Sequence, residues 1–117
     1  MDRLKAIHVV YARWCPHCVP LTVDSMENVA KELGAAFVLH DIDSEEADEA
    51  DELVKKYGDW SDDYLIPQVF LEFENGEFRH ILTGRPEGVK FTRKAIEDFL
   101  QSKFYRTLRE QNMGTKR

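Results

Sequence analysis

The sequence lacks features that are typical of membrane-spanning proteins and of general nucleic-acid-binding proteins. Its 117 residues contain no apolar run of the ~18–20 residues that a membrane helix needs, so we expect no membrane span. The net charge of −6 lacks the basic excess that general nucleic-acid binding requires. With 43% hydrophobic and 32% charged residues, the composition is that of a globular protein. The length suits one domain and is too short for two cores.

Cysteine is scarce, with only Cys15 and Cys18. A disulfide across so short a loop removes little chain entropy, so the pair is a redox centre or half of a metal site. Structural zinc needs two further ligands. No second cysteine pair exists, and His8, His40 and His80 are scattered in sequence and interpreted as strand residues. We therefore predict no metal site within one chain, and a metal bridge between two chains stays an alternative.

Apolar spacing predicts seven elements, in the order strand, helix, strand, helix, strand, strand, helix. The four strands are predicted at 7–11, 36–40, 68–74 and 77–83, the last two joined by an Asn75-Gly76 hairpin turn. The three helices are predicted at 16–33, 43–57 and 95–108, the last as one long amphipathic helix. Gly34 and Gly58 are expected to end the first two helices.

This order of elements predicts the fold class. Two strand–helix units followed by a hairpin form a four-stranded mixed sheet with helices on both faces, which is a three-layer α/β/α sandwich. We expect a single domain over residues 1–110 and a frayed tail over 111–117. Met1 leads directly toward an apolar strand, without a secretory signal. If Met1 is the native start, we expect a cytoplasmic protein with reduced thiols.

Charge is unevenly distributed along the chain. Eleven acidic residues and two lysines lie between positions 41 and 63, whereas eight basic and three acidic residues lie between 90 and 117. The simpler interpretation is that both stretches are solvated helix faces. A charge pair that selects a partner is the alternative, and the sequence alone does not distinguish the two.

The strongest functional signal is the run Trp14–Cys18, which reads Trp-Cys-Pro-His-Cys. Cys15 directly precedes a predicted helix start, where unpaired amides and a partial positive charge stabilise an anion. We expect its sulfur to accept hydrogen bonds from amides near Cys18, which favours the thiolate and makes Cys15 the nucleophile. Cys18, one turn further on, is expected to be screened from solvent and to act as the resolving thiol.

The two residues between the cysteines are expected to tune the couple. Pro16 stiffens the turn, and a protonated His17 would add positive charge beside the thiolate and hydrogen-bond the sulfur. Both effects stabilise the reduced form, which makes the disulfide a stronger oxidant. A surface histidine without a role is the alternative for His17.

These residues resemble the thioredoxin superfamily. The segment Val10–Cys18 is similar to the strand and active-site turn of that superfamily. A second, separate similarity runs from Tyr57-Gly58 through Ile66-Pro67 to the hairpin, and Gly84 stands where the family carries a glycine after its last strand. The resemblance implies a thioredoxin-like fold and a protein thiol–disulfide oxidoreductase with no cofactor besides the Cys15–Cys18 disulfide.

The resemblance also implies roles for residues near the cysteines. The Ile66–Pro67 peptide bond should be cis and should pack against the cysteine pair. The backbone of Ile66 would then be free to pair with an extended substrate peptide. Trp14 and Trp60 would form an apolar rim, and Arg13 could contact a carboxylate. The implied partners are disulfide-bearing proteins and an unidentified reductase or glutathione, and we expect a monomer.

Three departures from the family keep other functions open. The strand and helix that open thioredoxin proper are missing, as in glutaredoxin; Pro86 removes an amide where glutaredoxin binds glutathione; and the buried acid of thioredoxin aligns with Val9. The alternatives are a glutathione-dependent glutaredoxin-type enzyme, a metal-bridged dimer and a non-catalytic binding module. The direction of electron flow also stays open, because Pro16-His17 resembles the bacterial periplasmic disulfide-forming oxidase while the expected compartment is reducing.

Overall fold

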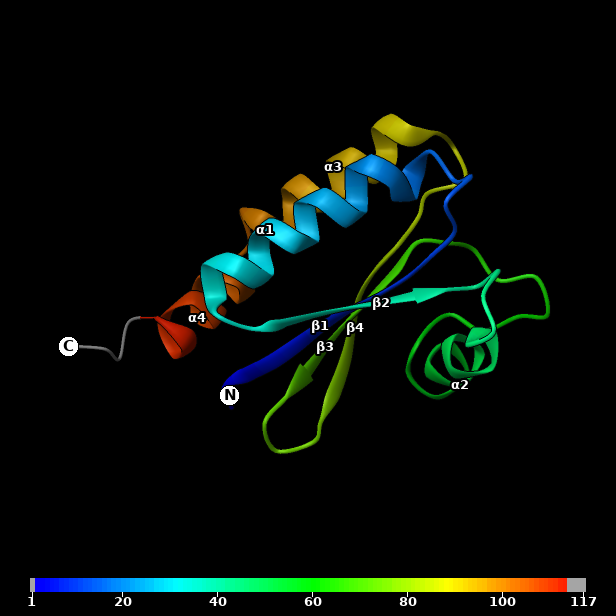
Figure 1. Cartoon of the computed structure of the whole chain (residues 1–117). Coiled ribbons are helices and arrows are strands. Elements are labelled where there is room, and N and C mark those ends of the chain that lie inside the picture. Colours follow the sequence, from blue (N-terminus) through cyan, green and yellow to red (C-terminus); the bar gives the residue numbers. More distant parts are fainter. Residues whose placement is uncertain (1, 114–117) are drawn as a thin grey trace.

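A computed structural model describes residues 2–113 and contains four strands and four regular helices. The strands are β1 (Leu4–Tyr11), β2 (Ala36–Asp41), β3 (Gln68–Phe73) and β4 (Phe78–Thr83). The helices are α1 (Val23–Leu33), α2 (Ala47–Tyr57), α3 (Val89–Leu100) and α4 (Lys103–Asn112), with an irregular turn, η1 (His17–Thr22), before α1. The predicted mixed α/β architecture with helices on both faces is confirmed (Figure 1).

The four strands form one sheet in the order β2–β1–β3–β4. β1 pairs in parallel with β2 and antiparallel with β3, and β3 pairs antiparallel with β4 through the predicted hairpin. Gly76 in that turn has φ 91°, which a glycine adopts without steric cost. Because β1 is a central strand, the residues that follow its C-terminal end lie between neighbouring strands and not at the side of the sheet.

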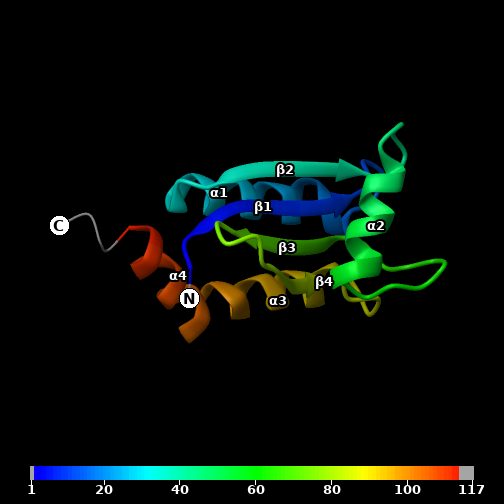
Figure 2. The same ribbon diagram turned by 90° about the horizontal axis from the view of Figure 1, so that it is seen from below.

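The two faces of the sheet bury different cores, since successive residues of a strand point to opposite faces. Val9 belongs to the larger core beneath α1, α3 and α4, whereas its neighbour Val10 packs with α2 and Phe70 on the other face. Figure 2 shows α2 crossing the sheet on its own while the remaining helices share the opposite side. Within residues 2–113, no helix combines the length and the apolar character needed to span a bilayer.

The first and second helices begin later than predicted. Val19 has extended backbone angles (φ −124°, ψ 124°), and the Val19–Pro20 peptide bond is cis. Proline has no amide hydrogen and disfavours helical geometry in the residue before it, so a continuous helix from Pro16 does not form and α1 starts at Val23. Gly34 ends α1 with φ 68°, as predicted. α2 starts at Ala47 instead of residue 43.

The predicted single C-terminal helix is wrong, because two helices, α3 and α4, occupy that region. The break falls at Ser102, whose backbone is extended (φ −77°, ψ 156°) and whose Oγ accepts the amide of Tyr105 at 3.0 Å. A serine side chain that accepts such a bond starts a new helix. The order of elements is therefore one helix longer than predicted.

The folded chain extends past the boundary predicted at residue 110. α4 continues to Asn112, which is only 1% exposed. Its side-chain amide bonds to the N–H and C=O of Leu4 and to the C=O of Leu33, each at 3.0 Å. Residues 111 and 112 therefore belong to the folded domain, while 114–117 of the predicted tail lie outside the described residues.

Candidate functional site

The two cysteines lie together just beyond the end of β1. Cys15 and Cys18 form a small buried cluster with Ala12, against which Ile42 and Ile66 pack. Cys18 is fully buried and Cys15 retains 4% exposure, and both are free thiols. The structure thus brings the predicted cysteines into one cluster with Ile66, a residue 48 positions beyond Cys18 in the printed sequence.

The hydrogen bonds around Cys15 differ from the prediction. The amides of Cys18 and Val19 donate to the carbonyl oxygen of Cys15, at 3.0 and 3.1 Å, rather than to its sulfur. The cause is local: the chain turns tightly after Cys15, so its carbonyl faces the amides that would otherwise be free. The backbone of Cys15 is therefore the acceptor that fixes the turn.

The Cys18 thiol is held in its neutral form. Burial raises the pKa of Cys18 well above its ordinary value, and its hydrogen bond to Cys15 and the charge of Cys15 raise it further. A hydrogen bond with the backbone of Ala12 acts in the opposite direction and is outweighed. Desolvation disfavours a thiolate because a low-dielectric interior does not stabilise the charge. Cys18 is therefore a protonated thiol while Cys15 beside it is reduced.

His17 is not a free surface side chain. Its Nδ1 lies 2.7 Å from the hydroxyl of Thr92, a fully buried residue in the first turns of α3. The same hydroxyl accepts the amide of Arg85 at 2.8 Å. A contact 75 residues away along the chain thus fixes one ring nitrogen of His17.

The loop at Pro67 approaches the cysteine cluster through Ile66. The Ile66–Pro67 peptide bond is cis, as the resemblance implied. Gly84 lies against this loop: its amide donates to the carbonyl of Pro67 at 2.8 Å, and a Cβ at that position would collide with the carbonyl oxygen of Ile66 and with Cδ of Pro67. Glycine at 84 is therefore required by close packing against the loop.

The predicted rim residues divide into two groups. Trp14 is 68% exposed next to the cysteines, and its indole Nε1 donates to Asp43 at 2.7 Å. Arg13 is also exposed, with Nε 3.3 Å from a carboxylate oxygen of Asp41. Trp60 belongs elsewhere, because its ring packs beside Tyr64 instead of joining the cysteine cluster.

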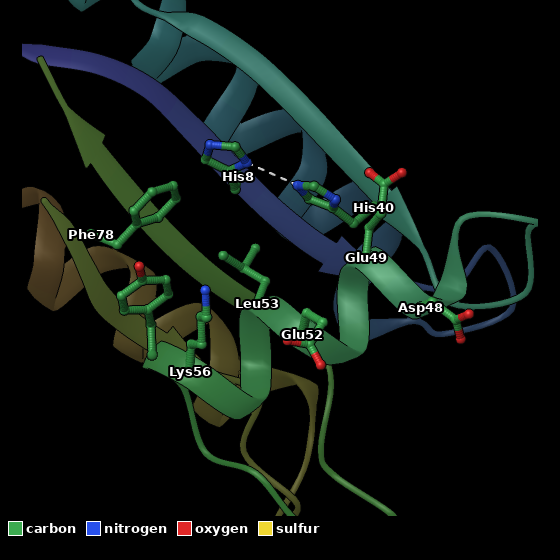
Figure 3. A pocket seen from close by; sticks show the side chains of 9 residues that line it. His8, His40, Asp48, Glu49, Glu52, Leu53, Lys56 and Phe78 are labelled. Carbon is green, nitrogen blue, oxygen red and sulfur yellow. Dashed lines mark hydrogen bonds between the residues drawn. The ribbon is translucent and has the colours of Figure 1, made fainter. Parts of the chain in front are cut away.

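A second polar cluster, which the sequence interpretation missed, crosses the α2 face of the sheet. His8 Nδ1 lies 2.8 Å from His40 Nε2, and His8 Nε2 lies 2.9 Å from a carboxylate oxygen of Glu72. We call His8, His40 and Glu72 the histidine row. Figure 3 shows the two imidazoles meeting between β1 and β2. These residues lie on three different strands, so no spacing in the sequence signals their contact, although the parallel pairing of 7–11 with 36–40 could have suggested it.

The histidine row borders an open cavity of about 490 Å³ between the sheet and α2. Phe78 and Tyr57 stack along it at 4.7 Å between ring centroids. Burial lowers the pKa of His40, His8 lowers it further, and Glu49 on α2 acts in the opposite direction. Within residues 2–113, no three histidine, cysteine or carboxylate side chains converge on a point that could hold a metal ion, and the row is a line of hydrogen bonds.

The fold and the site together define a small α/β domain in which a four-stranded mixed sheet presents a pair of neighbouring cysteines after its central strand. Compared with known proteins, the chain matches no protein-family model and no curated protein sequence. The function of the protein is therefore inferred from the geometry of the site.

Proposed function

We propose that this protein is a thioredoxin-like thiol–disulfide oxidoreductase whose redox couple is Cys15 and Cys18. The observation that carries the proposal is the asymmetry of the pair within one cluster. Cys18 is fully buried, protonated and hydrogen-bonded to Cys15, while Cys15 alone retains contact with solvent. A nucleophile in front of a protected resolving thiol is the arrangement that two-step exchange needs.

The first step is attack by the thiolate of Cys15 on one sulfur of a substrate disulfide. The substrate S–S bond breaks, one substrate sulfur leaves as a thiolate and takes a proton from solvent, and Cys15 is joined to the other sulfur. This mixed disulfide removes the negative charge of Cys15 that disfavours ionisation of Cys18. Ionisation of Cys18, which the second step needs, is therefore easier in the mixed disulfide than in the reduced protein.

The second step is attack by Cys18 on the sulfur of Cys15. Cys18 loses its proton, the mixed disulfide breaks, and the second substrate sulfur leaves and is protonated. The substrate has then gained two electrons and two protons, and the protein holds a Cys15–Cys18 disulfide. A dithiol reductant regenerates the reduced pair, and the same steps run in reverse when the protein disulfide oxidises a substrate dithiol.

The substrate class that fits this site is a disulfide in an extended protein segment. Ile66 packs against the cysteine cluster, and among residues 2–113 its peptide groups enter no backbone hydrogen bond. An added strand would use such groups and would lie beside Cys15. The exposed ring of Trp14 supplies apolar surface, and Arg13 supplies positive charge next to it.

The test is reduction of insulin disulfides with dithiothreitol as the electron donor. We expect the wild-type protein to accelerate insulin precipitation, and we expect Cys15→Ser to retain less than about one hundredth of that rate, since no nucleophile remains to form the mixed disulfide. Ser61→Ala, a substitution at an exposed serine outside the cysteine cluster, is the matched control and should behave as wild type. No acceleration by wild type, or full activity of Cys15→Ser, would overturn the proposal.

Glutathione supplied with its reductase separates the glutaredoxin-type alternative. If the protein is thioredoxin-like, turnover with glutathione should be much slower than with dithiothreitol. Equal or faster turnover with glutathione, with a glutathione adduct on Cys15, would identify a glutaredoxin-type enzyme instead.

A further inference from the structure

The hydroxyl of Thr92 joins the two halves of the candidate site. Oγ1 of Thr92 lies 2.7 Å from Nδ1 of His17, inside the cysteine motif, and 2.8 Å from the amide nitrogen of Arg85. Arg85 directly follows Gly84, whose amide holds the carbonyl of Pro67. A single buried side chain therefore connects the turn that carries the cysteines with the loop that faces them.

The single proton of the Thr92 hydroxyl determines which group is the donor in its hydrogen bond with His17. A hydroxyl has one proton to donate and lone pairs that accept. The Arg85 amide can only donate, so one lone pair of Oγ1 accepts it. Among the hydrogen bonds of residues 2–113, Oγ1 takes part in only these two, so its own proton has Nδ1 of His17 as its acceptor.

The opposite arrangement is costly. If Nδ1 carried the proton and donated to Oγ1, the hydroxyl proton of a residue with no exposed surface would have no acceptor among the described residues. A buried donor without a partner is unfavourable, because it has given up its hydrogen bonds to water and gained none in the protein. The neutral imidazole of His17 is therefore held with its proton on Nε2, and this Nε2–H is its one hydrogen-bond donor.

We propose that Thr92 is a positioning residue of the cysteine couple: its hydroxyl fixes His17 as the Nε2–H tautomer and ties that ring to the Gly84–Arg85 loop. The effect on the couple rests on the proposed function, whereas the tautomer of His17 does not. The two parts can therefore be measured separately.

The first measurement is ¹⁵N NMR of the histidine rings in the reduced protein at pH 8, where an ordinary imidazole is neutral. We expect His17 in wild type and in Thr92→Ser to show an unprotonated Nδ1 and a protonated Nε2. Thr92→Val, which keeps the shape and removes the hydroxyl, should give a mixture of tautomers. Thr107→Val, which removes another helix hydroxyl on α4, is the matched control.

A proton on Nδ1 of His17 in the wild type overturns the proposal without any variant. An unchanged tautomer in folded Thr92→Val overturns it as well. Should Thr92→Val fail to fold, the wild-type and Thr92→Ser spectra still decide, because both retain the hydroxyl.

The second measurement is the equilibrium constant of the Cys15–Cys18 couple against glutathione, taken in a double-mutant cycle. We expect Thr92→Val to change this constant about fivefold, which corresponds to one lost hydrogen bond worth about 1 kcal/mol. In a His17→Ala background the same substitution should change it less than about 1.5-fold, because the two residues act as one unit. Thr92→Ser should restore the wild-type value.

Equal effects of Thr92→Val in both backgrounds would show that Thr92 does not act through His17 and would overturn the positioning role. If the wild-type pair does not equilibrate with glutathione or any dithiol, the proposed function fails. In that case the ¹⁵N spectra still show whether Thr92 holds the ring, so the two failures are distinguishable.

Discussion

The cysteine cluster and the histidine row depend on the same strand but are assembled in different ways. Cys15 and Cys18 follow β1 within a few residues and meet through the turn of the chain. His8 lies within β1 and meets His40 and Glu72 only because β2 and β3 pair beside it, 32 and 64 residues away. The contrast teaches that a local motif shows its chemistry in its spacing, whereas a site spread over strands becomes visible only in the fold.

The two clusters also differ in what they are expected to do. In the cysteine cluster, a fully buried thiol with a raised pKa, Cys18, lies beside Cys15, which retains 4% exposure, and we propose a reaction for this pair. In the histidine row, the half-buried side chains hydrogen-bond to one another. Such pairing stabilises the fold and needs no further function to explain it. Four predictions separate a reactive cluster from a structural one.

The largest expected effect is a difference in reactivity between the two cysteines. Iodoacetamide at pH 7.5 should modify Cys15 at least about 100-fold faster than Cys18, because burial and Cys15 itself raise the pKa of Cys18 and thiolates are the reactive form. Peptide mapping after timed quenching measures both rates. Comparable rates would remove the asymmetry on which the proposed function depends.

Gly84→Ala should damage both stability and exchange. The new methyl group would meet the carbonyl of Ile66 and Cδ of Pro67, and such overpacking costs about 1–3 kcal/mol. We expect a lower urea midpoint and about tenfold slower insulin reduction. Gly34→Ala is the comparison: its φ of 68° penalises alanine by about 1–2 kcal/mol, yet no atom lies near the new Cβ. That variant should lose stability and keep its rate when assayed well below its unfolding midpoint.

His8→Leu should lower the stability of the protein and leave its rate of disulfide exchange nearly unchanged. It leaves His40 and Glu72 without their partner, which we expect to destabilise the protein by about 1–3 kcal/mol in urea unfolding. Insulin reduction by the folded variant should stay within about twofold of wild type. A large loss of activity at full folding would show that the histidine row contributes to exchange and that the two clusters are coupled.

The smallest effect is the pH dependence of stability. Burial lowers the pKa of His40 in the folded state below its value in the unfolded chain, so the unfolded chain binds a proton first as the pH falls. Stability should therefore be highest above about pH 6.5 and fall as the pH drops below it. His80, whose pKa is also lowered by burial, adds to the same trend.

His40→Gln tests the contribution of His40, because glutamine can hydrogen-bond but does not titrate in this range. Urea unfolding at pH 7.5 and at pH 5.5 should show a smaller loss of stability in His40→Gln than in wild type. An equal loss in both proteins would assign the pH dependence to other groups.

Much of the fold was predictable because its signals are local. Gly34 and the Asn75-Gly76 turn mark ends of elements through backbone preferences that depend on one or two residues, and both were placed correctly. The cysteine pair and the loop at Pro67 were likewise predictable, from spacing and from resemblance. What these features share is that no distant contact is needed to recognise them.

The remainder depended on tertiary structure. The apolar pattern continues from Phe99 to Leu108, so periodicity alone does not show that the Ser102 side chain begins a new helix. Asn112 looked like part of a polar tail, yet it satisfies buried backbone groups of Leu4 and Leu33. Thr92 gave no signal either, because a threonine within a helix is ordinary until α3 is seen to pack beside His17.

The central claim is tested most directly by trapping the mixed disulfide. Cys18→Ser, mixed with insulin whose native disulfides are intact and analysed by mass spectrometry without reduction, should carry one insulin molecule in a mixed disulfide with Cys15, because capture proceeds and resolution cannot. Cys15→Ser treated in the same way should carry none. No adduct on Cys18→Ser, or an equal adduct on Cys15→Ser, would contradict the assignment of Cys15 as the nucleophile.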